Sequence, residues 1–173
     1  MRQTHFLLLF ALATLSGCGA GQINTGPELA VFEVLAPSNT QTADGIDRVF
    51  VTALPPTNRF SLRWETKGNA SQEHTFDFFI RNEPSVEDED LGFIFRQDCG
   101  AEASVLSDCI SVGETSCTFT SSLSVSCTGG KTGRTELRLT DLNVAFMIGR
   151  ICYRDEQLDQ SCTSITVAAE LHP

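Results

Sequence analysis

The sequence predicts an all-β domain, and three observations support this fold class. Apolar and polar residues alternate with a period of two in several separate segments, which is typical of half-buried strands. Helical periodicity nowhere persists for the roughly eleven residues that would indicate a helix. Six of the seven cysteines lie in the second half of the chain and form three consecutive pairs whose members are ten positions apart, which indicates a domain cross-linked by disulfides. The 173 residues leave room for one such domain with a tail.

The first part of the domain is predicted to contain four strands. Residues 29–35 and 48–54 are candidates for the first two, and a turn-rich stretch that includes Pro37 and Gly45 separates them. Residues 59–65 and 74–81 both alternate cleanly. The inward-facing positions expected in these two strands are Phe60, Leu62, Trp64, Phe76, Phe78 and Ile80.

The second part is predicted to begin with a short strand at 93–96 and to end with strands at 135–142, 145–153 and 162–169. Between them, residues 97–130 hold four cysteines and are expected to form a cysteine-rich insertion. Within this insertion, residues 115–128 alternate with a period of two apart from Ser121, and a turn at Ser121-Ser122 would divide them into two short strands.

The polar face of residues 115–128 consists of serine and threonine side chains. A flat row of hydroxyls could serve as a ligand platform. The alternative is an ordinary solvated strand face, which we favour because threonine is common in strands.

The cysteines predict a disulfide framework once Cys18 is set aside. Six cysteines allow fifteen connectivities, and their spacing narrows the choice because three pairs of neighbouring cysteines are each ten residues apart. This spacing suits disulfides that close short hairpins or loops. The predicted pairs are Cys99 with Cys109, Cys117 with Cys127, and Cys152 with Cys162. Zinc is disfavoured because no C-x-x-C motif occurs and histidines are few.

The N-terminus predicts export and lipid attachment. A short positive start is followed by an apolar run that is too short to span a bilayer, as in secretory signals. The run ends in Leu15-Ser16-Gly17-Cys18, which resembles the bacterial lipobox. The resemblance implies that residues 1–17 are a lipoprotein signal peptide and that Cys18 carries acyl chains such as palmitate. Gly19 in place of aspartate then favours the outer membrane of the cell envelope, and residues 18–28 would be a flexible tether to a domain at 29–173.

Short segments of the domain resemble the fibronectin type III and immunoglobulin-like families. The tryptophan-bearing segment 59–64 looks like the second strand of such a module, and residues 137–169 are similar to its last three strands. The resemblance implies a β-sandwich with Trp64 in its core, the alternative being a tryptophan that stacks on a ligand. Two departures are Phe146, which stands where a tyrosine is expected, and the cysteine-rich insertion.

The last predicted hairpin suggests a partner-binding patch. With Cys152 opposite Cys162, one face of residues 145–153 carries Phe146 and Ile148, and Phe79 could join them. Because the strand is apolar on both faces, its second face must be covered, either by another part of the chain or by a binding partner. We expect either a docked envelope protein or, as the favoured alternative, the cysteine-rich insertion folded over the patch.

An acidic loop between two predicted strands is a weak candidate for a calcium site. Residues 83–90 hold five carboxylates, among them Glu87, Asp88 and Asp90. Hard oxygen ligands suit Ca²⁺, but the spacing lacks the EF-hand pattern. A solvated acidic loop is the favoured interpretation, so no metal is expected here.

The composition excludes several classes of function. A net charge of −10 with only two lysines gives no basic surface for nucleic acid. His74 is the only histidine within the folded region away from the terminus, and we expect it to be a solvated edge residue, so we predict a protein that is not an enzyme and needs no cofactor. The expected function is an envelope-anchored lipoprotein that acts as a binding or scaffold module. The alternative is an inhibitor of an envelope or extracellular hydrolase, with a rigid loop such as 97–117 entering the active site.

Overall fold

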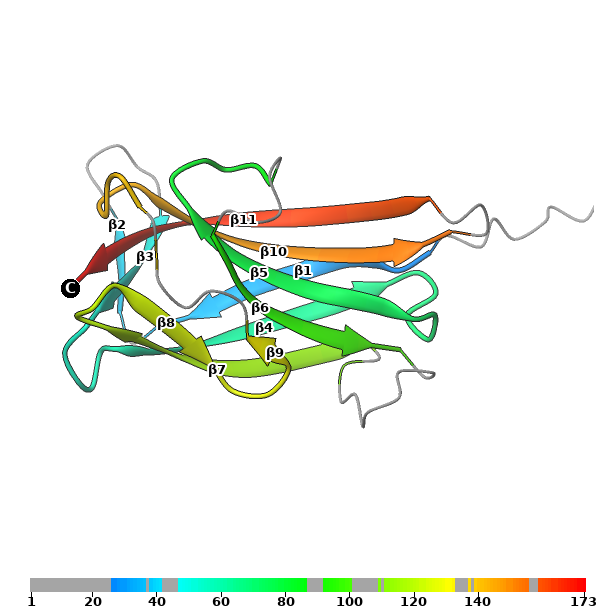
Figure 1. Ribbon diagram of the computed structural model, residues 1–173, viewed down its shortest axis with the longest axis horizontal. Helices are drawn as coiled ribbons and strands as arrows, with labels where there is room; N and C mark the ends of the chain where they lie inside the picture. The colour runs from blue at the N-terminus through cyan, green and yellow to red at the C-terminus, as the bar shows by residue number, and fades with distance from the viewer. Residues whose placement is uncertain are drawn as a thin grey trace, which may run out of the picture.

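The chain folds into two β-sheets packed face to face (Figure 1). The computed structural model describes residues 26–36, 38–41, 47–86, 92–100, 109, 111–132, 137, 139–155 and 159–173. These residues contain strands and no helix, so none of them forms a helix that could cross a membrane. The prediction of an all-β, disulfide-stapled sandwich is therefore confirmed.

The smaller sheet has four antiparallel strands in the order β1-β4-β7-β8. The strands β4, β7 and β8 alternate between buried and more exposed residues, because one face packs on the core and the other faces solvent, and β1 does so after a shift in register between Leu29 and Val31. Their bounds are β1 Glu28–Leu35, β4 Arg59–Lys67, β7 Val112–Thr120 and β8 Ser124–Cys127.

The larger sheet has seven strands in the order β2-β3-β11-β10-β5-β6-β9. Only β3 and β11 pair in parallel among these described strands; the other neighbours are antiparallel. The bounds are β2 Ser38–Gln41, β3 Asp47–Thr52, β5 His74–Arg81, β6 Phe93–Cys99, β9 Lys131–Thr132, β10 Ala145–Arg154 and β11 Gln160–His172.

The core between the sheets is centred on Trp64. Its indole stacks on the ring of Phe76 in the opposite sheet, with 3.8 Å between centroids and an interplanar angle of 3°. On its own sheet the indole lies over Gly113, where an added Cβ would come within 2.1 Å of Cζ2. The indole is therefore a buried core residue, as the favoured interpretation of the sequence predicted.

All three predicted disulfides are present, with Cα–Cα distances of 5.2 Å for 99–109, 4.0 Å for 117–127 and 4.2 Å for 152–162. Two of them join residues that lie directly opposite each other in an antiparallel pair. Cys117 faces Cys127 across β7 and β8, and Cys152 faces Cys162 across β10 and β11. In the β7–β8 hairpin Thr120 faces Ser124, so the chain turns at residues 121–123, which include the predicted Ser121-Ser122.

Three expectations about chain organisation need correction. Residues 97–130 are not an insertion, because β6 ends within them and β7 is an inner strand of the smaller sheet. No strand includes residues 137 or 139–142, although one was expected at 135–142. The tether ends before residue 28, because Gly26 and Pro27 are already buried and β1 starts at Glu28.

Candidate functional site

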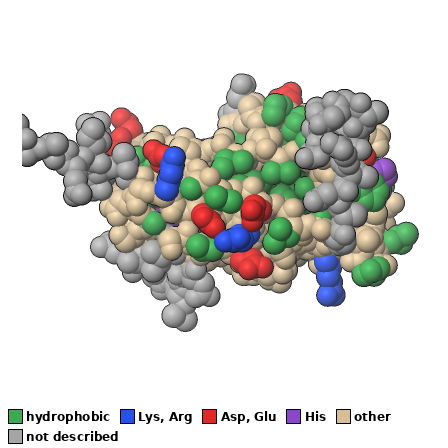
Figure 2. Space-filling model, turned by 180° about the vertical axis from the view of Figure 1, so that it is seen from behind, with side chains coloured by type: hydrophobic (Ala, Val, Ile, Leu, Met, Phe, Trp, Pro, Cys, Tyr) green, Lys and Arg blue, Asp and Glu red, His purple; other side chains and the backbone are tan. Residues whose placement is uncertain are grey.

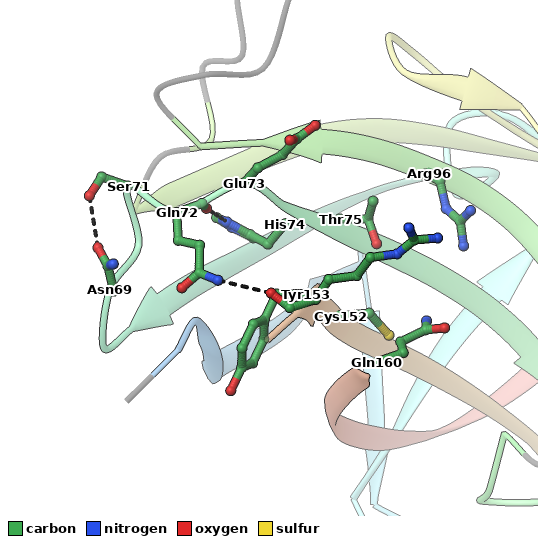
Figure 3. Close-up of a pocket in the computed structure, with 11 residues that line it drawn as sticks. Asn69, Ser71, Gln72, Glu73, His74, Thr75, Arg96, Cys152, Tyr153 and Gln160 are labelled. Carbon is green, nitrogen blue, oxygen red and sulfur yellow. Dashed lines mark hydrogen bonds between the residues drawn. The ribbon is translucent and has the colours of Figure 1, made fainter. Parts of the chain in front are cut away.

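A groove of about 750 Å³ opens at the end of the sandwich where β5 begins, β10 ends and β11 begins (Figure 3). The β4–β5 loop forms one wall, and the ends of β10 and β11 form the other. Polar side chains dominate the lining. The lining residues are Asn69, Ser71, Gln72, Glu73, His74, Thr75, Arg96, Cys152, Tyr153, Arg154 and Gln160.

Hydrogen bonds hold the loop wall in place. Gln72 reaches across to β10, and its Nε2 donates to the backbone oxygen of Arg154 at 3.1 Å. Ser71 donates to Asn69 at 2.8 Å, which closes the turn of the loop. Figure 3 shows Asn69, Ser71 and Gln72 on one side of the groove, with Arg96, Cys152 and Gln160 on the other. The wall therefore comes from a local turn that is tied to a strand distant in sequence.

His74 is a buried residue of this site, with an exposed fraction of 2%. The expectation of a solvated edge residue was wrong, because position 74 shares the inward face of β5 with Phe76 and lies opposite Tyr153 on the neighbouring strand. Burial lowers the pKa of His74 from its ordinary value, while a hydrogen bond with Gln72 acts in the opposite direction.

The hydrogen bond made by Nδ1 of His74 leaves the second ring nitrogen as a buried acceptor. Its Nδ1 lies 2.7 Å from the carbonyl oxygen of Gln72, so Nδ1–H is the donor and Nε2 carries the lone pair of the neutral ring. This buried Nε2 has no hydrogen-bond partner among the described residues. An unpartnered buried acceptor is unusual, because such groups are costly to leave without a partner.

A network of buried charges lies beside the groove on the outer face of the larger sheet. Asp77 is fully buried and accepts two hydrogen bonds from Arg96, at 2.6 and 2.9 Å, and one from Arg150 at 2.9 Å. The two guanidinium groups also lie over aromatic rings, Arg150 at 4.8 Å from Phe79 and Arg96 at 5.5 Å from Phe93. The network fixes the position of Arg96, which lines the groove.

The apolar patch expected for a protein partner is not at the surface. Phe79 and Ile148 are both fully buried, and Phe146 is partly buried. Residues 101–108 and 110 of the cysteine-rich segment expected to cover the patch lie outside the described residues. Described residues 82–86 of the β5–β6 loop fold over this face, where Thr166 next to Ile148 donates to the Pro84 oxygen at 3.1 Å.

The same face is closed by its own side chains. The Arg150 guanidinium lies over the ring of Phe79, and the ring of Phe93 packs against that ring at 5.6 Å between centroids. Phe79, Phe146 and Ile148 are therefore not a docking patch of the described chain.

The outer face of the smaller sheet carries the row of hydroxyl side chains. Some of these hydroxyls bond to one another, as Thr120 and Ser124 do at 2.6 Å, which favours the interpretation of a solvated face. Arg63 forms ion pairs there with Glu65 at 2.6 Å and with Glu33 at 3.5 Å. A second groove of about 660 Å³ lies beside the end of β1 and includes Leu35 and Arg59. Figure 2 shows a face on which acidic and basic side chains lie next to one another among hydrophobic ones.

Several predicted sites lie outside the described residues. Cys18 and the signal peptide do, and so do Glu87, Asp88 and Asp90 of the acidic loop. Within the described part of the chain, no group of three or more metal-ligating side chains is present.

The groove was not foreseen from the sequence. Its walls come from segments about eighty residues apart, and their meeting depends on the pairing of β5 with β10, which alternation alone does not predict. One available signal was the Cys152–Cys162 pair, because it marks the turn of the last hairpin and hence one end of the sheet.

Comparison with protein-family models finds no match, and searches of the curated proteins and of the solved structures find none either.

Proposed function

We propose that this chain is a lipid-anchored lipoprotein of the bacterial envelope whose β-sandwich is a binding module, with the polar groove at the β5–β10 end as its ligand site. Attachment through Cys18 and a place at the outer membrane rest on the lipobox-like sequence. The observation that carries the binding role is the groove itself. It combines a hydrogen-bonded wall with a guanidinium that Asp77 holds in place.

Attachment at Cys18 is tested by fractionation of bacterial cells. The native chain should sediment with membranes and incorporate labelled palmitate, since acyl chains supply the hydrophobic anchor. The Cys18→Ser variant should lose the label and leave the membrane fraction. A native chain that stays in the soluble fraction without label would disprove the anchor.

Binding in the groove is tested by NMR on the full mature chain carrying Cys18→Ser. The probes are N-acetylglucosamine, free amino acids and glycerol phosphate at millimolar concentration. At least one probe should shift the backbone amides of Thr75, Tyr153 and Gln160, which belong to the groove. Arg154→Gln should weaken that response, whereas Arg59→Gln, a matched change in the second groove, should not. Shifts confined to other residues, or no shifts with any probe, would contradict the proposed site.

The inhibitor alternative is favoured by one observation. The Cys99–Cys109 disulfide closes a loop at the groove end of the sandwich, and the backbone of Gly100 at its start packs against Gln72. A disulfide-closed loop of this kind would lose little conformational entropy on entering an active site. Inhibition assays with lysozyme and with serine proteases test this alternative. The native chain should inhibit one of these enzymes, and the double variant Cys99→Ala/Cys109→Ala should not.

A further inference from the structure

The chain enters the sandwich at the groove. Gly26 lies against the ring of Tyr153, a groove residue, so closely that a Cβ on Gly26 would come within 2.1 Å of Tyr153 Cζ. Gly26 and Pro27 are both buried, and β1 starts at the end of the molecule where β10 ends and β11 begins (Figure 1). The C-terminus lies at the opposite end.

Covalent geometry limits how far this end can lie from the proposed anchor. Gly26 is eight positions after Cys18 in the chain. A fully extended chain spans at most about 3.6 Å per residue, so the separation is at most about 29 Å. With Cys18 acylated, the groove is at the membrane-proximal end of the sandwich and within reach of the lipid surface.

The groove wall on the outer face of the larger sheet offers mainly hydrogen-bond donors. Arg154 is exposed, and alternation along β10 places it on the same face as Arg150 and Cys152. No described carboxylate forms an ion pair with it, while Thr75 and the amide of Gln160 lie beside it in the lining. Arg96 lines the same wall with 35% of its side chain exposed. Figure 3 shows the carboxylate of Glu73 turned away from Thr75 and Cys152.

Two arginines together with a hydroxyl and an amide suit a ligand that supplies several oxygen acceptors and a negative charge. Phosphate meets this requirement, because guanidinium groups bind its oxygens through charge-assisted hydrogen bonds. The wall is also rigid before any ligand arrives. Asp77 holds Arg96 through two hydrogen bonds, and the Cys152–Cys162 disulfide joins the two strands that carry Arg154 and Gln160.

We propose that the groove binds the phosphate of a phospholipid headgroup at the surface to which Cys18 anchors the chain. The inference rests on the proposed function, since it takes the anchor and the groove from it. The headgroup contact would hold the sandwich in a fixed orientation, with its groove end on the membrane and its opposite end directed away from it.

The first experiment measures the binding of soluble headgroup compounds to the groove. The full mature chain with Cys18→Ser is titrated with glycerophosphoglycerol, inorganic phosphate and glycerol, and the amides of Thr75 and Gln160 are followed by NMR. Both phosphate compounds should shift these amides, and glycerol should not. Arg154→Gln should weaken binding about tenfold or more, as expected for loss of one charged hydrogen bond. Arg59→Gln is the matched control and should bind as the native chain does.

The second experiment asks whether the lipid is the source of the phosphate. The acylated chain is placed in nanodiscs of phosphatidylcholine and phosphatidylglycerol that contain a headgroup spin label. The amide of Thr75 should be broadened strongly and that of exposed Leu54, in the β3–β4 turn, should not. Arg154→Gln should reduce the broadening at Thr75, whereas Arg59→Gln should leave it unchanged.

The outcomes separate this inference from the function on which it rests. Phosphate binding in solution without broadening in nanodiscs would mean a soluble phosphate ester and would overturn the lipid assignment. Groove binding of a sugar or amino acid, with no response to any phosphate compound, would overturn the inference and leave the proposed binding role intact. No response to any probe would overturn both.

Discussion

At the scale of single residues, His74 and Asp77 show how burial gives polar side chains a structural role next to the groove. His74 is held neutral by burial, and its Nδ1–H ties the β4–β5 loop through Gln72. Asp77 accepts hydrogen bonds from two arginines on the neighbouring strands. Both therefore stabilise the walls of the groove from below its surface.

The burial of His74 predicts acid sensitivity. Its pKa is lowered in the folded chain, so between that pKa and the ordinary value of 6.5 the unfolded chain binds more protons than the folded one. This contribution to stability is complete above about pH 6.5 and is lost as the pH falls through the lowered pKa. Thermal melting between about pH 7 and pH 5.5 should show a smaller decrease for His74→Asn than for the native chain.

The control for this experiment is His172→Asn, because the His172 side chain is 43% exposed. Its melting should follow the pH dependence of the native chain. Equal slopes for all three proteins would show that His74 does not contribute to the acid sensitivity.

The charge network predicts a large stability loss on removal of its shared carboxylate. Asp77→Ala would leave Arg150, with 7% of its side chain exposed, without its buried counter-ion. Breaking a buried pair from one side costs about 3–5 kcal/mol. Glu33→Ala removes an exposed partner of Arg63 and should cost no more than about 1 kcal/mol. Urea unfolding of the oxidised chains measures both, and equal losses would contradict the prediction.

At the scale of elements, the sequence predicts best those strands that have one apolar face toward the core and one more polar face. Residues 59–65 and 74–81 were predicted because their inward positions are apolar, and β5 has the bounds that were expected. The strands β2 and β9 were missed because they are short and polar and lie at the edges of the larger sheet. The strand expected at 135–142 shows the reverse error: alternation is present there, but residues 137 and 139–142 form no strand.

The three disulfides predict unequal contributions to stability from loops of equal length. Each joins cysteines ten residues apart, so the loop-entropy model assigns about 3 kcal/mol to each. Cys117 and Cys127 are both buried in the core, however, whereas Cys162 is exposed. Replacing both cysteines of a pair by alanine should therefore destabilise the chain more at 117 and 127 than at 152 and 162. Guanidinium unfolding of the two double variants measures the loss in the free energy of unfolding for each. Equal losses would indicate that loop entropy alone determines the stability that each disulfide contributes.

At the scale of the whole molecule, the fold class and the disulfide framework could be predicted, but the candidate site could not. Alternation and cysteine spacing are local properties, and the sandwich and its hairpin disulfides follow from them. The groove requires residue 72 to meet residue 154, and Phe79 is packed against Arg150 and Phe93, which come from the two neighbouring strands. Such contacts depend on strand order and loop path, which the alternation of a single strand does not specify.

The connectivity of the disulfides has a consequence for how an exported chain matures. The three disulfides join their six cysteines in consecutive pairs, first with second, third with fourth and fifth with sixth, so no bond overlaps or encloses another. A chain that emerges from a translocation channel with its N-terminus first presents these cysteines pair by pair. Oxidation in order of emergence then yields the native pairing directly, whereas overlapping connectivities would require disulfide reshuffling. The parallel pairing of β3 with β11 must wait until both strands have crossed, so covalent closure of the hairpins can precede completion of the larger sheet.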